Sequence, residues 1–174
     1  MSTSVAYTWG STPEERASAF PCDALAGPDA LACFRAVDVH APADVLFRWL
    51  CQLRAAPYSY DWIDNRGRRS PRTLTPRLDE LEVGQAVMGI FRLASFERDR
   101  HLTIQTAGGR LGTFFVTYRI DASEPDRCRL VVKLLGDLPS RPMSRLLAWL
   151  FHWADLVMMR RQLLNLKKLA ERDA

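Results

Sequence analysis

The last third of the chain carries a helical repeat, and a long stretch of two-residue repeats precedes it. Apolar residues recur at helical spacing between about Arg141 and Glu171, at Leu146, Leu147, Leu150, Ala154, Val157, Met158 and Leu164. About 30 residues at ~1.5 Å per residue form a helix of roughly 45 Å, which crosses a whole small domain. We therefore expect one long amphipathic helix over the preceding sheet, with a cavity between them.

The two-residue repeats predict an antiparallel sheet. Apolar and polar residues alternate near 33–40, 85–97, 100–107, 111–121 and 127–137, and turn signals separate the later segments. One face carries Leu102, Ile104, Val116 and Val132. The opposite face carries His101, Thr103 and Gln105 and is expected to face water. The fold class that follows is α+β.

A shorter helix is predicted between the first strand and the rest of the sheet. Pro42 and Asp44 mark its start, because proline suits the first turn and an acid stabilises the positive end. The first 30 residues have no sustained period. We therefore divide the chain into an N-terminal extension, 1–30, with Trp9 and Phe20 as local anchors, and one domain, 31–174.

Composition narrows the functional classes. The net charge is only +4, and basic and aromatic residues do not interleave along one face, so no nucleic-acid partner is expected. The most apolar stretch is about 14 residues long and includes His152 and Asp155, so no integral membrane segment is expected. No export signal is visible, and we expect a cytoplasmic protein, either a monomer or a homodimer.

Cysteine spacing and glycine patterns give no indication of a metal or cofactor. Cys33, Cys51 and Cys128 lie in apolar contexts without a CxxC pair, which favours buried free thiols. No histidine lies at metal-ligand spacing, and neither a P-loop nor a GxGxxG fingerprint occurs. We therefore expect no metal site and no cofactor.

The order of strand, helix, aromatic loop, antiparallel strands and long helix resembles the helix-grip fold of the SRPBCC superfamily. That superfamily includes START-like lipid-transfer domains and polyketide cyclases. Three segments carry the resemblance: Val37–Leu50, Pro57–Asn65 and Asp155–Lys167. The last two are similar to a bacterial subgroup. The resemblance implies a curved sheet wrapped around the C-terminal helix, with an apolar ligand between them and no universal catalytic motif.

Tyr58, Tyr60, Asp61 and Trp62 form the densest group of aromatic and acidic side chains. Two phenols and a carboxylate near a cavity mouth suit the orientation of a carbonyl ligand or proton transfer to it. Alternatively, the rings pack the first helix against the sheet, and Asp61 caps a turn or pairs with an arginine. Tyr58 and Tyr60 are candidate ligand-binding residues, and Tyr60 and Asp61 are candidate catalytic residues.

His152 and Asp155 are three residues apart on the predicted long helix and therefore share a face. A carboxylate fixes the tautomer of a neighbouring imidazole and raises its pKa, which suits acid–base catalysis. Alternatively, the pair lies at the cavity rim or in solvent, because the predicted apolar stripe runs to one side of it. Both residues are candidate catalytic residues.

Other candidate ligand-binding residues lie where the sheet is expected to face the long helix. Tyr118 lies on the inward strand face, where its hydroxyl needs a partner in the protein or the ligand. The sequence does not decide which sheet face Arg92 points to. Either Val87, Gly89 and Phe91 or Met88, Ile90 and Arg92 could form the inward face. An inward Arg92 would anchor the carboxylate of a ligand. The remaining predicted cavity-lining residues are Phe91, Phe114, Leu150 and Met158.

Three functions follow from these patterns. The first is a binding module that holds a small hydrophobic or amphipathic molecule between the sheet and the long helix. The second is a polyketide cyclase or aromatase-like enzyme that uses the same cavity and moves protons through Tyr60, Asp61 or His152 and Asp155. The third is an interaction protein whose arginine-rich loop contacts an acidic partner. We favour the first, with the enzyme as the alternative.

Overall fold

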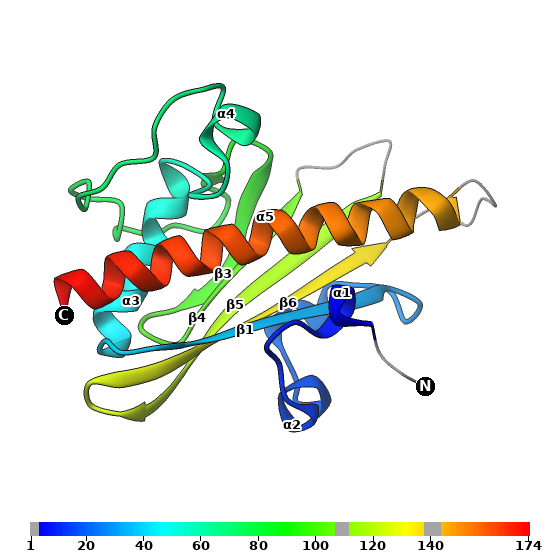
Figure 1. Ribbon diagram of the computed structural model, residues 1–174, viewed down its shortest axis with the longest axis horizontal. Coiled ribbons are helices and arrows are strands. Elements are labelled where there is room, and N and C mark those ends of the chain that lie inside the picture. Colours follow the sequence, from blue (N-terminus) through cyan, green and yellow to red (C-terminus); the bar gives the residue numbers. More distant parts are fainter. Residues whose placement is uncertain (1–3, 107–111, 138–143) are drawn as a thin grey trace.

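The fold is a six-stranded antiparallel sheet with one long helix across it (Figure 1). The computed structural model describes residues 4–106, 112–137 and 144–174, and leaves the side chains of 137 and 144–151 undescribed. The strands are β1 (Leu31–Val39), β2 (Ala86–Val87), β3 (Phe91–Glu97), β4 (His101–Thr106), β5 (Thr113–Glu124) and β6 (Arg127–Asp137), in the spatial order β1-β6-β5-β4-β3-β2.

One helix dominates the helical part of the fold. α5 (Ser144–Asp173) lies against the sheet, and the shorter helices are α1 (Val5–Thr8), α2 (Pro13–Ala17), α3 (Ala43–Cys51) and α4 (Asp61–Asp64), with 3₁₀ turns η1 (Pro21–Ala24) and η2 (Gln52–Arg54). The predicted α+β helix-grip architecture, a curved antiparallel sheet with a long C-terminal helix, is confirmed. No helix in the described ranges is long and apolar enough to cross a membrane.

The segment predicted as one strand over 85–97 is divided into two. Met88 and Gly89 have φ of 46° and 76°, and this left-handed backbone ends β2 before β3 begins. The Met88 N–H donates to the Leu53 carbonyl oxygen at 3.0 Å, which fixes the turn against η2. Alternation alone could not reveal the break, because the residues on both sides of it keep the strand pattern.

The inner sheet face holds the main core. The inward residues predicted from alternation, including Leu102, Ile104, Val116 and Val132, are buried. They meet the apolar side of α3 and the second half of α5, where Leu163, Leu166, Leu169 and Ala170 are buried as well. Towards the first half of α5 the inner face is less completely filled, and the site described below lies there.

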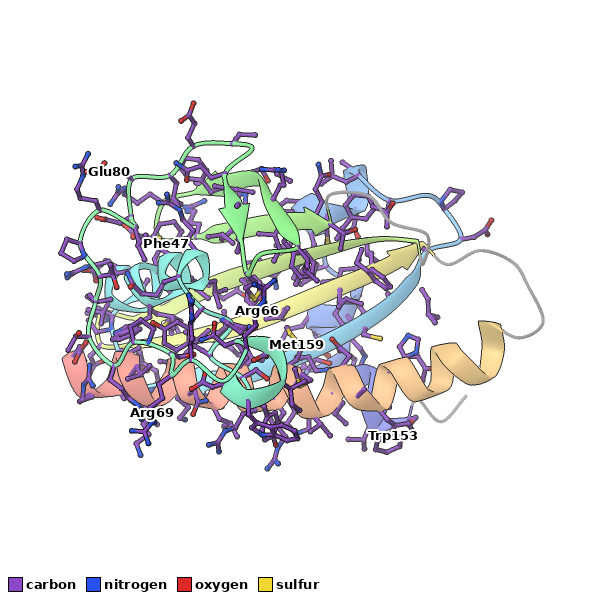
Figure 2. The ribbon with its side chains drawn as sticks, turned by 90° about the horizontal axis from the view of Figure 1, so that it is seen from above. Phe47, Arg66, Arg69, Glu80, Trp153 and Met159 are labelled. Atoms are coloured by element: carbon purple, nitrogen blue, oxygen red, sulfur yellow. The ribbon has the colours of Figure 1, made fainter. Side chains whose placement is uncertain are left out.

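The predicted apolar stripe of α5 is wrong at three of its four described positions. Met158 lines the inner side, and the side chains of Leu146, Leu147 and Leu150 lie outside the described residues. Val157 and Leu164 are 51% and 38% exposed, and Ala154 is also exposed. The buried residues instead recur at His152, Leu156, Met159, Gln162, Leu163 and Leu166. In Figure 2, Met159 points from α5 towards the sheet and Trp153 points away from it. Residues 156–159 are all apolar, so their spacing does not fix which side is buried, and the polar His152 and Gln162 obscured the true stripe.

The expectation that the outer sheet face meets water is also wrong near its centre. Thr103 and Thr117 are fully buried there. Their hydroxyl oxygens lie 2.9 Å apart, and the Cys22 N–H donates to Thr117 Oγ1 at 3.2 Å. A second apolar cluster forms around them from Phe20, Cys22, Phe34, Ala36, Phe115, Val131 and Leu135. Residues before β1 thus cover the outer face, with Phe20 buried at the centre of the contact.

Backbone pairing and ion pairs hold this N-terminal segment in place. The Ala36 N–H donates to the Trp9 carbonyl oxygen at 3.0 Å, and Gly10 passes so close to Ala36 that a Cβ there would collide with its carbonyl oxygen. Arg129 pairs with Glu15, and Lys133 pairs with Asp23. Sequence positions more than 100 residues apart therefore form one packed layer.

Candidate functional site

A cavity of about 670 Å³ lies between the first half of α5 and the inner face of the sheet. Its walls are mainly apolar, with Ile90, Phe91, Phe114, Val116, Leu134 and Met158 among them. Its polar lining comes from Ser59, Asp64, Thr106, Tyr118, Asp155 and Gln162. A volume of this size, with few polar groups in an apolar wall, is typical of sites for small molecules.

Two simple periodicities bring the lining together. Phe114, Val116 and Tyr118 alternate along β5, so all three point to the inner face. Asp155, Met158, Met159 and Gln162 are three or four positions apart on α5, so they share one side of the helix. The pairing of β5 with β4 and β6 then fixes the wall opposite α5.

Tyr118 has a partner within the protein. Its hydroxyl donates to Gln162 Oε1 at 2.7 Å, and Gln162 Nε2 donates to the Pro57 carbonyl oxygen at 2.6 Å. Burial raises the pKa of the Tyr118 phenol far above its usual range, so the phenol stays neutral. These two consecutive hydrogen bonds connect β5, α5 and the segment before α4 beside the cavity.

Asp155 is the acidic residue of the cavity wall on α5, and a buried arginine faces it. Arg35 of β1 is 1% exposed; its Nη2 donates to Asp155 Oδ2 at 2.9 Å and its Nη1 donates to the Phe34 carbonyl oxygen at 2.8 Å. Arg35 Nε is buried without a hydrogen-bond partner among the described residues. Burial raises the pKa of Asp155 to about 6, against the opposing effect of Arg35. The carboxyl therefore changes charge near neutral pH within an apolar wall.

His152 lies beside this pair but does not line the cavity. Its side chain is buried, and its ring centroid lies 4.7 Å from that of Tyr7 in α1. Asp155 forms an ion pair with Arg35 of β1, a partner that the helical spacing did not suggest. The alternative that placed the pair in solvent is wrong, because His152 is buried and the Asp155 side chain is only 10% exposed. A catalytic role for either residue stays a prediction.

The aromatic and acidic group before and within α4 lies outside the cavity lining, which includes none of Tyr58, Tyr60, Asp61 and Trp62. Tyr58 and Asp61 instead line a smaller polar hollow of about 70 Å³, and Ser59 lines both hollows. The Tyr58 ring packs edge-on to Trp49, and the Arg161 guanidinium lies over the Tyr60 ring. Asp61 accepts hydrogen bonds from the Ser70 N–H at 3.0 Å and from Ser70 Oγ at 2.5 Å. For Tyr58 and Asp61 these contacts are the packing and turn-capping roles that the sequence also allowed, whereas Trp62 is 76% exposed and does not have the packing role.

The remaining predicted ligand-binding residues fall in different places. Phe91, Phe114 and Met158 line the cavity with Tyr118. Arg92 is exposed on β3, and its Nη1 donates to the Gly84 carbonyl oxygen at 3.2 Å. Leu150 lies in α5, but its side chain is outside the described residues. Binding by any of these residues stays a prediction.

Three polar residues of this region were missed from the sequence. Arg35 lies on the same face of β1 as Cys33 and Val37. A charged residue within an apolar strand face indicates a buried ion pair, because a buried charge needs a partner. Gln162 is a polar residue on the buried side of a long helix, and Asp64 carries an Oδ1 that is buried without a partner in the described part of the chain. Both carried a weaker signal, since exposed glutamines and aspartates are common.

No cluster of three or more histidine, cysteine, aspartate or glutamate side chains suited to a metal ion occurs within the described ranges. The four cysteines are buried and free, as predicted for Cys33, Cys51 and Cys128. Burial raises the pKa of the Cys33 and Cys51 thiols to about 12, so both remain protonated. The chemistry available at the cavity is therefore that of two carboxyls, an amide and hydroxyl groups.

Comparisons with known proteins bear on the fold. No family model matches the chain, and no curated protein matches its sequence. Among solved structures, the Zhui aromatase/cyclase from Streptomyces sp. R1128 matches with a TM-score of 0.53 and 14% identity over 82% of this chain and 94% of that one. Norcoclaurine synthase from Thalictrum flavum matches with a TM-score of 0.54 and 12% identity over 80% and 86% of the two chains.

A third structure, TTHA0849 from Thermus thermophilus, matches with a TM-score of 0.54 and 15% identity over 83% of this chain and 99% of that one. Identities this low establish the fold alone. With the sheet order and the position of α5, they confirm the expected architecture. The chain has the helix-grip fold of SRPBCC-type proteins.

Proposed function

We propose that the protein binds a small hydrophobic or amphipathic molecule in the cavity between the sheet and α5. The observation that carries this proposal is the apolar cavity of about 670 Å³, whose wall includes the carboxyl of Asp155. Apolar walls favour a ligand by removing its surface from water, and one polar group fixes its orientation. The ligand class that fits is an apolar molecule with a single hydrogen-bonding or cationic group.

Native mass spectrometry of freshly purified protein, with titration of the dye anilinonaphthalene sulfonate, tests the proposal. We expect either a co-purified small molecule or saturable dye binding at one equivalent. Val116→Phe places a ring in the cavity wall and should weaken binding by roughly tenfold or more. Ala122→Phe is the matched control, because it adds the same ring to the same strand outside the cavity.

Circular dichroism confirms that both variants are folded before binding is compared. Wild-type protein that retains no ligand and binds neither the dye nor members of a lipid and polyketide panel would refute the proposal. Equal dye affinity in the two folded variants would place the dye outside the cavity and would refute it as well.

A proton-transfer enzyme of the cyclase or aromatase kind is the second candidate function. The observation that favours it is the Asp155 carboxyl, whose raised pKa of about 6 suits a general base at neutral pH. Deuterium incorporation next to the carbonyl of an aromatic ketone measures such chemistry. Asp155→Asn should slow the exchange by roughly 100-fold, and equal rates in the two proteins would exclude this function.

A further inference from the structure

One side of the molecule combines exposed apolar side chains with arginines at the edge of the cavity. Trp62 and Ile63 of α4 are 76% and 53% exposed, and Ile90, which belongs to the cavity lining, is exposed as well. Figure 1 shows α4 and the loop after it at the top of the molecule, above α5 and α3. Large apolar residues exposed together on one surface are typical of a docking site.

Cationic side chains come from the loop that follows Trp62 and Ile63 and from α5. The loop after α4 contributes Arg66, Arg68, Arg69 and Arg72, and α5 contributes Arg161 and Lys168, which line the smaller hollow together with Arg72. We call these six residues with Trp62, Ile63 and Ile90 the basic rim. Figure 2, seen from above, shows Arg66 and Arg69 on the same upper side as α4.

The charge of the basic rim is only partly offset by neighbouring acids. Within the part of the chain that the structure describes, none of its six cations forms an ion pair. Asp61 and Asp64 line the same hollows as most of these cations, and six cations against two carboxylates leave an excess of four positive charges. By contrast, Arg129 and Lys133 on the outer sheet face are paired with Glu15 and Asp23.

The basic rim also adjoins the cavity. Asp64, Met88 and Ile90 line both the apolar cavity and a neighbouring surface hollow that contains Arg66 and Arg68. A flat anionic surface would contact the arginines while Trp62 and Ile63 entered its apolar layer. A protein partner would have to supply both an apolar pocket for Trp62 and acids on every side of it. A bilayer of anionic lipid supplies both over its whole area.

We propose that the basic rim docks the protein peripherally on membranes containing anionic lipid. Trp62 and Ile63 enter the interface between headgroups and acyl chains, and the arginines contact the lipid phosphates and carboxylates. Docking in this way holds the edge of the cavity against the bilayer. It does not require the cavity to be occupied, so it stands or falls separately from the proposed ligand binding.

Co-sedimentation with vesicles tests this proposal. Vesicles of phosphatidylcholine with about 30% phosphatidylserine should bind the wild-type protein, vesicles of phosphatidylcholine alone should not, and about 0.5 M salt should weaken the binding. Arg68→Gln with Arg69→Gln should weaken it by roughly 25-fold, because each arginine near an anionic surface contributes about fivefold. Trp62→Ala should weaken it by roughly fivefold or more, and should abolish quenching of tryptophan fluorescence by brominated lipid.

The matched control is Arg77→Gln with Arg100→Gln, which removes the same charge from exposed arginines outside the basic rim. This control and Val116→Phe should bind vesicles as the wild type does. Equal losses in the control and in the Arg68/Arg69 variant would overturn the proposal, because net charge alone would explain them. Binding to polyglutamate without binding to any vesicle would also overturn it in favour of an acidic protein partner.

Discussion

The two faces of the sheet are both covered, but in different ways. On the outer face the N-terminal segment packs directly against the strands, with Phe20 and Cys22 buried and the Thr117 hydroxyl hydrogen-bonded. On the inner face α5 is closely packed along its second half, and a cavity of about 670 Å³ lies beside its first half. The outer layer therefore contributes stability, whereas the inner layer also offers space.

The difference follows from the polar groups that each face buries. The outer face uses short side chains, Thr103 and Thr117, whose hydroxyls satisfy each other and a backbone N–H. The inner face buries a full ion pair, Arg35 with Asp155, whose Arg35 Nε has no partner in the described residues. A buried charge has a large desolvation cost, and natural proteins retain it most often where it serves function.

The largest expected effect comes from breaking the inner-face pair. Arg35→Leu should lower the free energy of unfolding by about 3–5 kcal/mol at neutral pH, because it leaves Asp155 in an apolar wall without its partner, where the carboxyl must either carry an unpaired charge or bind a proton. This loss of stability is measured by denaturant unfolding, with tryptophan fluorescence as the signal. Adding Asp155→Asn should restore much of the loss. Arg92→Leu, at an exposed arginine, is the matched control and should change stability by less than about 0.5 kcal/mol.

The outer layer should respond almost as strongly to loss of its central ring. Phe20→Ala should lower the free energy of unfolding by about 3 kcal/mol, since it leaves a void between the N-terminal segment and the sheet. Leu25→Ala, at an exposed position of the same segment, should cost much less. Similar losses of stability for the two variants would mean that Phe20 is not packed between the N-terminal segment and the outer sheet face as described above.

A smaller effect should appear in the pH dependence of stability. The pKa of Asp155 is about 6 in the folded protein and about 4 when unfolded, so the native state binds this proton more tightly. Its contribution to stability should therefore be full below about pH 4, decrease by about 2 kcal/mol as the pH rises to about 6, and level off above that. Urea unfolding at a series of pH values measures this decrease, and Asp155→Asn should remove it. A wild-type stability that rises over this range, with no change in the variant, would contradict the assignment.

The sequence predicted the strands and the long helix well because both signals are local. Alternation placed Leu102, Ile104 and Val116 on the inner face, and the helix over the sheet followed from its length. The orientation of α5 about its own axis was not predictable in the same way. Leu156 to Met159 are apolar all round, so the buried side is decided by contacts with the sheet and with Tyr7.

The candidate site depends on such long-range contacts even more. Phe114, Tyr118 and Met158 were predicted from local pattern, and they line the cavity. The partner of Asp155 is Arg35, 120 residues earlier in the chain, and no local spacing connects the two. The N-terminal segment presents the same difficulty, because its polar composition indicates an extension and its burial arises only from the sheet that it meets.

The contact between Trp9 and Ala36 affects how readily the edge of the sheet can pair with another protein chain. A strand at the edge of a sheet offers unpaired N–H and carbonyl groups on which another chain can build. β1 is such a strand, and the Trp9 carbonyl takes up its Ala36 N–H while Gly10 lies against the same residue. At the opposite edge β2 is two residues long and ends in a left-handed turn. Pairing with a second chain is therefore restricted at Ala36 on one edge strand and by the shortness of β2 at the other edge.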